Sequence, residues 1–255
     1  MSLIRALVRL HPASFRERWG PALEADARAA GHRSWPNLLA SAVGLWLHPV
    51  VWPAKSPSQR HHRAAAMAFA LTLATWFVGR AATTNDPRLT WRAHRTLTVA
   101  DCAAFMLLGA VLILPLPRPT WHAAATLVRK SLRALAAPAA LGAGALLFVR
   151  TAHPAELSAI RPLVTAVYWL TLALTAIQAA RIVATVSASA VTPPSPARLR
   201  PGIATLAAGG ALTAWIGLSS TTAGHGFDAL SAATGGCVLI LTGMFLSILR
   251  DLNEY

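Results

Sequence analysis

The feature that most constrains this chain is the run of residues 229–249, 21 residues without a charged side chain. An α-helix of that length rises about 30 Å, which is the thickness of the hydrocarbon core of a bilayer. A soluble domain within a chain of 255 residues has no need for a helix that is apolar on all its sides. The run therefore predicts a helix that spans a membrane.

Five further stretches have a similar composition, although prolines or polar residues interrupt them. Only 13% of all residues are charged, about half the share that soluble domains carry. We therefore expect an all-α fold, a polytopic membrane helical bundle of about six transmembrane helices that fills residues 64–255. The predicted spans are residues 64–82, 97–116, 134–149, 162–180, 202–220 and 229–249.

The formal net charge of +14 has two interpretations, a nucleic acid partner or the anionic inner leaflet of a membrane. The basic residues fall between the apolar stretches and do not gather on one soluble face. Such a distribution favours contact with lipid headgroups. We therefore expect a lipid bilayer with an anionic inner leaflet as the partner, and no nucleic acid.

Basic residues also predict the orientation, because Lys and Arg are enriched in cytoplasmic loops. With the N-terminus inside, 17 of the 23 basic residues lie on the cytoplasmic side and 6 lie outside. The strong Arg and Ala bias is typical of a GC-rich bacterial genome, so we predict a multi-pass protein of the bacterial cytoplasmic membrane with both termini in the cytoplasm. The first thirty residues are charged throughout, and we expect no cleavable signal peptide.

Residues 1–33 form a predicted cytoplasmic, amphipathic helical segment ahead of the spans. His11-Pro12 should break it into two helices, Ser14 and Glu17 should form a capping box, and Gly31 should end the second helix. Two roles stay open for this segment, packing against the inner membrane face or docking a protein partner. The candidate docking residues are Phe15, Arg16, Glu17, Arg18 and Trp19.

Residues 34–63 predict an interfacial helix followed by a basic linker. The apolar run 34–52 holds fewer than twenty residues, three tryptophans and Pro49, which suits a helix in the membrane interface better than one that crosses it. If this run did span, the count would become seven and every later loop would change sides. His61 and His62 are adjacent, so their side chains diverge on a helix, and no metal site is expected.

The residues between Leu7 and Gly20 carry one recognisable pattern. Arg9, Leu10 and Pro12 form an RLxP turn, and residues 15–20 read FRERWG. This pattern resembles the prefix found ahead of the membrane part of some bacterial permeases, in which an RLxP turn precedes an FRERYG helix and an acidic pair. Pro21-Ala22 replaces that pair here. The resemblance covers about twenty residues, implies a membrane protein near transport systems and transfers no catalytic residue.

Ionisable residues at membrane depth are the default functional candidates, and they are few in this chain. Arg80 and Asp101 lie near the outer ends of two consecutive predicted spans. One hypothesis is an ion pair that fixes this hairpin, and the alternative is two side chains that reach the interface separately. Small residues at a spacing of four, such as Gly209, Thr213 and Gly217, predict close helix packing and are compatible with a homo-oligomer or a substrate path.

The search for enzyme motifs is negative. The sequence contains no H-E-x-x-H, no G-x-S-x-G, no P-loop and no pair of carboxylates within one span. We therefore expect no catalytic residues, no cofactor and no enzymatic activity, and any ATP-driven role would need a separate ATPase chain.

Two functions are compatible with these patterns. The first is a non-enzymatic component of a permease-like or exporter-like transport system, with a cytoplasmic ATPase docked on the basic segment 121–133. The second is an accessory, sensing or scaffolding membrane protein whose N-terminal helices bind a cytoplasmic regulator. The spans lack a polar stripe that would mark a substrate path, which argues against the first function.

Overall fold

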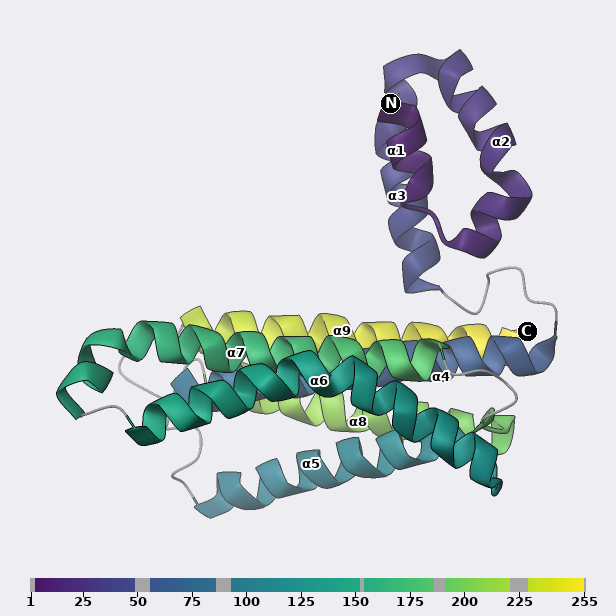
Figure 1. Cartoon of the computed structure of the whole chain (residues 1–255). Helices are drawn as coiled ribbons and strands as arrows, with labels where there is room; N and C mark the ends of the chain where they lie inside the picture. Colours follow the sequence, from purple (N-terminus) through teal and green to yellow (C-terminus); the bar gives the residue numbers. More distant parts are fainter. Residues whose placement is uncertain are drawn as a thin grey trace.

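The computed structural model describes residues 3–48, 56–85, 93–151, 154–185, 191–220 and 229–254. These residues are almost entirely α-helical, which confirms the all-α bundle expected from the sequence. Figure 1 shows two parts, a bundle of long helices and a small N-terminal unit whose helices run crosswise to those of the bundle.

The N-terminal unit consists of α1 (Leu3–Arg9), α2 (Ala13–Ala30), a 3-10 turn (Gly31–Ser34) and α3 (Trp35–Leu47). The predicted break after α1 and the predicted end of α2 are both confirmed, and Gly31 takes the positive φ of 65° that favours glycine. The helices meet through small and branched apolar residues, and the buried ones are Val8, Ala27, Leu38 and Ala42.

The predicted capping box at the start of α2 is wrong. The helix begins at Ala13, one residue before Ser14, so Pro12 occupies the N-cap position and no side chain caps the helix. A proline at this position has its φ near −53°, which already directs the chain into the first turn. The backbone of Phe15 and Arg16 donates to the Pro12 carbonyl, both at 3.0 Å, and replaces the side-chain cap.

The bundle contains a helix for each of the six predicted spans. Most of these helices extend beyond the predicted limits, because polar flanks such as residues 57–63 and 121–133 continue the adjoining helix. They are α4 (Pro57–Asn85), α5 (Ala93–Ile113), α6 (Trp121–Thr151), α7 (Pro154–Thr185), α8 (Pro196–Ser220) and α9 (Ala229–Glu254).

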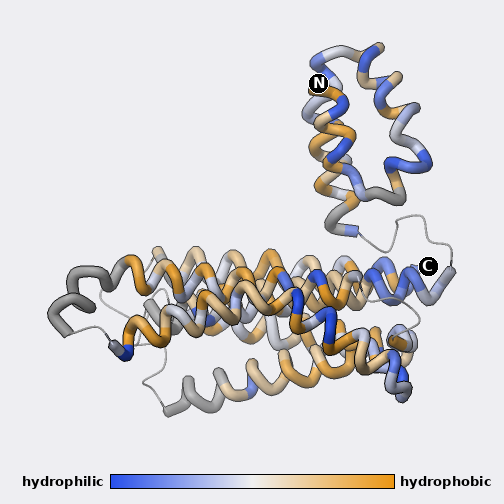
Figure 2. Tube along the Cα trace, in the orientation of Figure 1, coloured by the Kyte–Doolittle hydropathy of each residue, from blue (hydrophilic) through white to orange (hydrophobic). Residues whose placement is uncertain are grey.

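Five helices of the described chain are long and apolar enough to cross a membrane, namely α4, α6, α7, α8 and α9. The apolar part of α5, Ala100–Ile113, is shorter. By length and composition, the chain is a multi-pass membrane protein. Figure 2 shows apolar residues over the long middle of the helices and hydrophilic residues near the end where α4 begins.

The helices run alternately up and down, so that several chain segments meet at one end of the bundle. Here β1 (Leu116–Pro117) pairs antiparallel with β2 (Val191–Thr192), linking the segments before α6 and α8. At the same end Lys130 Nζ donates to the Thr185 carbonyl at 2.5 Å, and Arg200 donates to the Leu252 carbonyl at 3.1 Å. We call this the proximal end, because the N-terminal unit adjoins it, and the opposite end the distal end.

Helix α8 packs closely against α5 and α9. A Cβ added to Gly109 would lie 2.6 Å from Leu206 Cγ, and one added to Gly217 would lie 2.9 Å from Gly235 Cα. Glycine is therefore required where these helices touch. Gly209 and Gly217, which the sequence singled out, do form helix contacts, as does Gly235 on α9, whereas Gly236 and Gly243 face open space.

Helices α6 and α7 form an outer pair that packs together and joins the bundle mainly through α4. Large apolar side chains on this pair are exposed, as expected of surfaces that face acyl chains rather than water. They include Val128, Leu132, Leu146, Leu147, Leu163 and Leu170.

Replacement of Gly217 by alanine should destabilise the bundle by roughly 1–3 kcal/mol, since the new methyl group would meet the α9 backbone. The measurement is the thermal unfolding midpoint of the detergent-solubilised protein by circular dichroism. Gly236→Ala is the matched control, because nothing lies within 4 Å of its added Cβ and alanine is the better helix former. Equal midpoints for the two variants would contradict the close α8–α9 contact.

Candidate functional site

The bundle contains a partly open cavity of about 680 Å³ between α4, α5, α7, α8 and α9. It exists because α5 packs against α8 while α7 packs against α4, so α5 and α7 stay apart on either side of α4. Small residues on the facing helices leave the space unfilled, and they are Gly79, Ala103, Ala110, Ala176 and Ala179. Its volume lies within the range of small-molecule sites.

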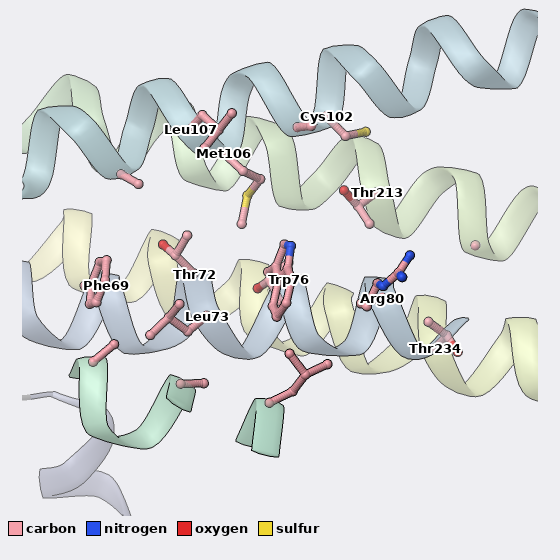
Figure 3. A pocket seen from close by; sticks show the side chains of 18 of the residues that line it. Phe69, Thr72, Leu73, Trp76, Arg80, Cys102, Met106, Leu107, Thr213 and Thr234 are labelled. Carbon is pink, nitrogen blue, oxygen red and sulfur yellow. The ribbon is translucent and has the colours of Figure 1, made fainter. Parts of the chain in front are cut away.

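The wall of the cavity is predominantly apolar. Figure 3 shows Phe69, Leu73 and Trp76 along α4 and Met106 and Leu107 on α5 across from them. These side chains carry the large apolar surface that an apolar ligand could contact.

Several hydroxyl groups in this wall are bonded within their own helices. Thr72 Oγ1 donates to the Ala68 carbonyl at 2.8 Å, and Thr75 Oγ1 donates to the Leu71 carbonyl at 2.9 Å. Thr213 Oγ1 donates in the same way to the Gly209 carbonyl at 2.7 Å. Such bonds satisfy the hydroxyl donors locally, so the wall suits an apolar ligand better than a sugar or an amino acid.

Arg80 lies toward the distal end of α4, and among the lining residues that the structure describes it is the one with a formal charge. Its Nε donates to the Tyr168 hydroxyl of α7 at 3.4 Å. One turn away, the rings of Phe77 and Trp169 pack edge to face with centroids 5.3 Å apart. These contacts hold α7 against α4 and place the guanidinium group at one end of the cavity.

The structure does not bring Arg80 and Asp101 together. Among the ion pairs between described residues, none joins these two side chains. Asp101 is exposed on α5, which packs against α8 and touches α4 only slightly. The two residues lie on consecutive helices, but α5 packs mainly against α8 and not against α4.

The cavity itself was missed at the sequence level. The sequence did contain a signal for it. Thr72, Trp76 and Gly79 lie four and three positions apart, which places them on one face of the helix predicted for residues 64–82. A face that mixes hydroxyl, indole and glycine among alanines and leucines differs from a uniform lipid-facing surface. Its recognition required knowledge of which other helices surround it.

The five candidate docking residues of the N-terminal unit fall into two groups. Phe15 and Arg16 are half-buried: the Phe15 ring contacts the His11 and Trp19 rings, and an Arg16 amine donates to the Arg9 carbonyl of α1 at 3.4 Å. Arg16 therefore joins α2 to the end of α1, and Phe15 packs against the turn between the two helices. Glu17, Arg18 and Trp19 are exposed, with the Arg18 guanidinium carbon 5.1 Å from the centre of the Trp19 ring. Only this second group is available to a partner.

The N-terminal unit contacts the bundle through a polar cluster that we call the latch. His48, directly after α3, lies with its Nδ1 2.9 Å from Asp251 Oδ2 and 3.1 Å from Ser247 Oγ, both on α9. The Asp251 side chain is 9% exposed, so its carboxylate needs this partner in place of water. The sequence did not predict the latch, because His48 lies 203 residues from Asp251 and 199 residues from Ser247 along the chain.

Within the described parts of the chain, no group of three His, Cys, Asp or Glu side chains could hold a metal ion. The described cavity lining contains no histidine and no carboxylate, so no acid–base pair faces the cavity. No protein family model matches the sequence, and no curated protein or solved structure matches it. The geometry of the cavity, the latch and the N-terminal unit therefore carries the functional argument.

Removal of the latch carboxylate by Asp251→Ala should release the N-terminal unit from α9 and speed trypsin cleavage after Lys55. The loss of one charge-assisted hydrogen bond, about 1.5 kcal/mol, corresponds to roughly tenfold faster cleavage if cleavage requires release. Glu254→Ala is the matched control, since it removes a carboxylate from the same helix but one paired with the exposed Arg250. Similar cleavage rates in the two variants would contradict the latch.

Proposed function

We propose that this protein is the non-enzymatic membrane component of a transport system that works with a separate ATPase. The observation that carries the proposal is the N-terminal unit, which presents an exposed charged and aromatic surface while the latch ties it to the last helix of the bundle. A partner bound to this unit is therefore in mechanical contact with a helix that also lines the cavity. The apolar cavity removes the objection that a transport bundle should carry a polar stripe, because an apolar cargo needs none.

A second candidate function is an accessory protein whose N-terminal unit binds a cytoplasmic regulator. It is favoured by a second exposed surface on α3, where Trp35, Leu39 and Val43 follow one another at a spacing of four. Leu38 and Ala42 are buried beside them, so α3 is apolar on two faces, of which one packs within the unit. Exposed apolar patches of this kind mark contact with a protein or with the membrane interface.

The proximal end is the proposed cytoplasmic end, in the cytoplasmic membrane of a bacterium. The described basic residues near it outnumber those near the distal end, where the helix ends carry Arg80, Arg95, Arg150 and Arg161. Arg88 and Arg92, which count toward the predicted outer side, lie outside the described residues. The asymmetry of Lys and Arg supports both termini in the cytoplasm.

Reporters fused to the two termini test this orientation. Alkaline phosphatase, which is active outside the cytoplasm, should be inactive at both ends, and a fluorescent protein that matures in the cytoplasm should be bright at both. A phosphatase inserted after Ala223, between α8 and α9, should be active. Opposite results at the two termini would mean an odd number of spans and would contradict the proposed topology.

Affinity purification from gently solubilised membranes tests the docking role. The double variant Glu17→Arg, Arg18→Glu should lose its partner, since both side chains are exposed. Glu254→Arg, a charge reversal at an exposed site on α9, is the control and should keep the partner. An ATPase in the wild-type sample supports transport, a signalling or DNA-binding protein supports the accessory function, and equal recovery from all variants contradicts docking through α2.

A further inference from the structure

We propose that the cavity binds an anionic phospholipid from the surrounding bilayer, with one acyl chain between α4, α5 and α7 and the phosphate at Arg80. This inference goes beyond the transport role, because it rests on the cavity and on the membrane location and requires no ATPase. It assigns a lipid class to a site that the sequence did not reveal.

The first argument is the shape and chemistry of the cavity. Along α4 the lining runs from Phe69 to Arg80, which corresponds to about 16 Å of helix and suits an extended chain rather than a compact molecule. Leu107 and Trp76 line the cavity and are 68% and 49% exposed, so the cavity is open to the surroundings of the bundle. In a bilayer those surroundings are acyl chains, and an acyl chain is the apolar molecule present at the highest concentration.

The second argument is that threonine hydroxyls of the wall already have hydrogen-bond acceptors and need none from a ligand. Thr72, Thr75 and Thr213 donate to carbonyls of their own helices, so an acyl chain beside them leaves no hydroxyl donor unsatisfied. A hydrated, polar occupant would gain few hydrogen bonds here and would lose its water. The wall therefore selects a hydrocarbon chain.

The third argument is the charge at one end. Arg80 is the one formally charged residue among the described lining residues, and Figure 3 shows it in line with Trp76 and Thr72 along α4. A guanidinium group presents several N–H donors in a plane and matches the oxygens of a phosphate. The bond from its Nε to the Tyr168 hydroxyl orients the group at the cavity end.

A lipid with an anionic headgroup matches both parts of the site, because its acyl chain fits the apolar wall and its phosphate fits Arg80. Arg80 lies next to the last residue of the apolar span of α4, Pro57–Ala81, so a phosphate bound there would stay near headgroup depth while its chain enters the cavity. A zwitterionic lipid offers the same chain and phosphate but adds a cation beside Arg80. The site should therefore prefer phosphatidylglycerol to phosphatidylcholine.

The test uses the full chain in nanodiscs of equal parts phosphatidylglycerol and phosphatidylcholine, with a photoreactive acyl chain on one lipid or the other. Labelled peptides are quantified by mass spectrometry. We expect labelling concentrated on the lining segments of α4, α5 and α7, with about a fivefold preference for phosphatidylglycerol, the effect of one arginine near an anionic headgroup. Arg80→Gln should abolish the preference and keep the labelling, whereas Arg80→Lys should keep most of both.

Two pairs of variants separate the parts of the proposal. Arg150→Gln removes another exposed distal arginine that does not line the cavity, and it should leave the preference unchanged. Ala176→Phe and, independently, Ala103→Phe fill the cavity and should reduce labelling of its lining by both lipids at least severalfold. Ala136→Phe adds the same bulk to an exposed face of α6 and should have no effect. Unfolding midpoints of all variants identify any that fail to fold.

Several outcomes would overturn the proposal. Even labelling over all exposed helix faces would mean ordinary bilayer contact, and a preference that survives Arg80→Gln would place the headgroup elsewhere. A photoreactive fatty acid that labels the lining better than either phospholipid would identify a free acid as the occupant. Protein–protein crosslinks through the lining residues would identify a second copy of the chain.

Discussion

The close approach of α8 to its two neighbours is the contact on which the rest of the bundle depends. In a bilayer, apolar side chains gain little by meeting each other instead of lipid, so helices associate where their backbones can come near. Glycines provide that approach, with Gly109 and Gly202 between α5 and α8 and Gly217 and Gly235 between α8 and α9. The three helices form a unit whose geometry is fixed by backbone contact, and the remaining helices are arranged around it.

The cavity is a consequence of this arrangement rather than a separate feature. Because α5 is held by α8, it is not available to cover α4, and α7 is held to α4 by contacts such as the edge-to-face packing of Phe77 and Trp169. The space between α5 and α7 is bordered by alanines and glycines and stays open. Acyl chains of the bilayer can fill an open apolar space. The charged residues at its border would then decide which lipid headgroup is preferred. Arg80 borders it at one end.

The sequence was sufficient to predict where the helices lie along the chain, but it did not predict which helices pack against one another. Hydropathy located six bundle helices and α3, because the length and composition of each are local properties. It could not show which faces meet, since interior and lipid-facing surfaces are equally apolar. The suggested Arg80–Asp101 pair assumed that consecutive helices pack together, whereas α5 lies against α8. The capping box assumed that α2 begins at Ser14, whereas Pro12 starts it earlier. The latch joins His48 to Asp251 and leaves no local pattern.

Helix α9 connects the features that bear on function. At its proximal end Ser247 and Asp251 hold the N-terminal unit, near its distal end Ser231 and Thr234 line the cavity, and between them Phe245 and Ile248 lie in the core. Its whole length packs on α8, so α9 cannot tilt without moving the glycine contacts that hold α8. Helix α9 therefore joins the N-terminal unit to the cavity wall as one continuous helix. The proposed transport role would require such a path between partner docking at one end and ligand binding at the other.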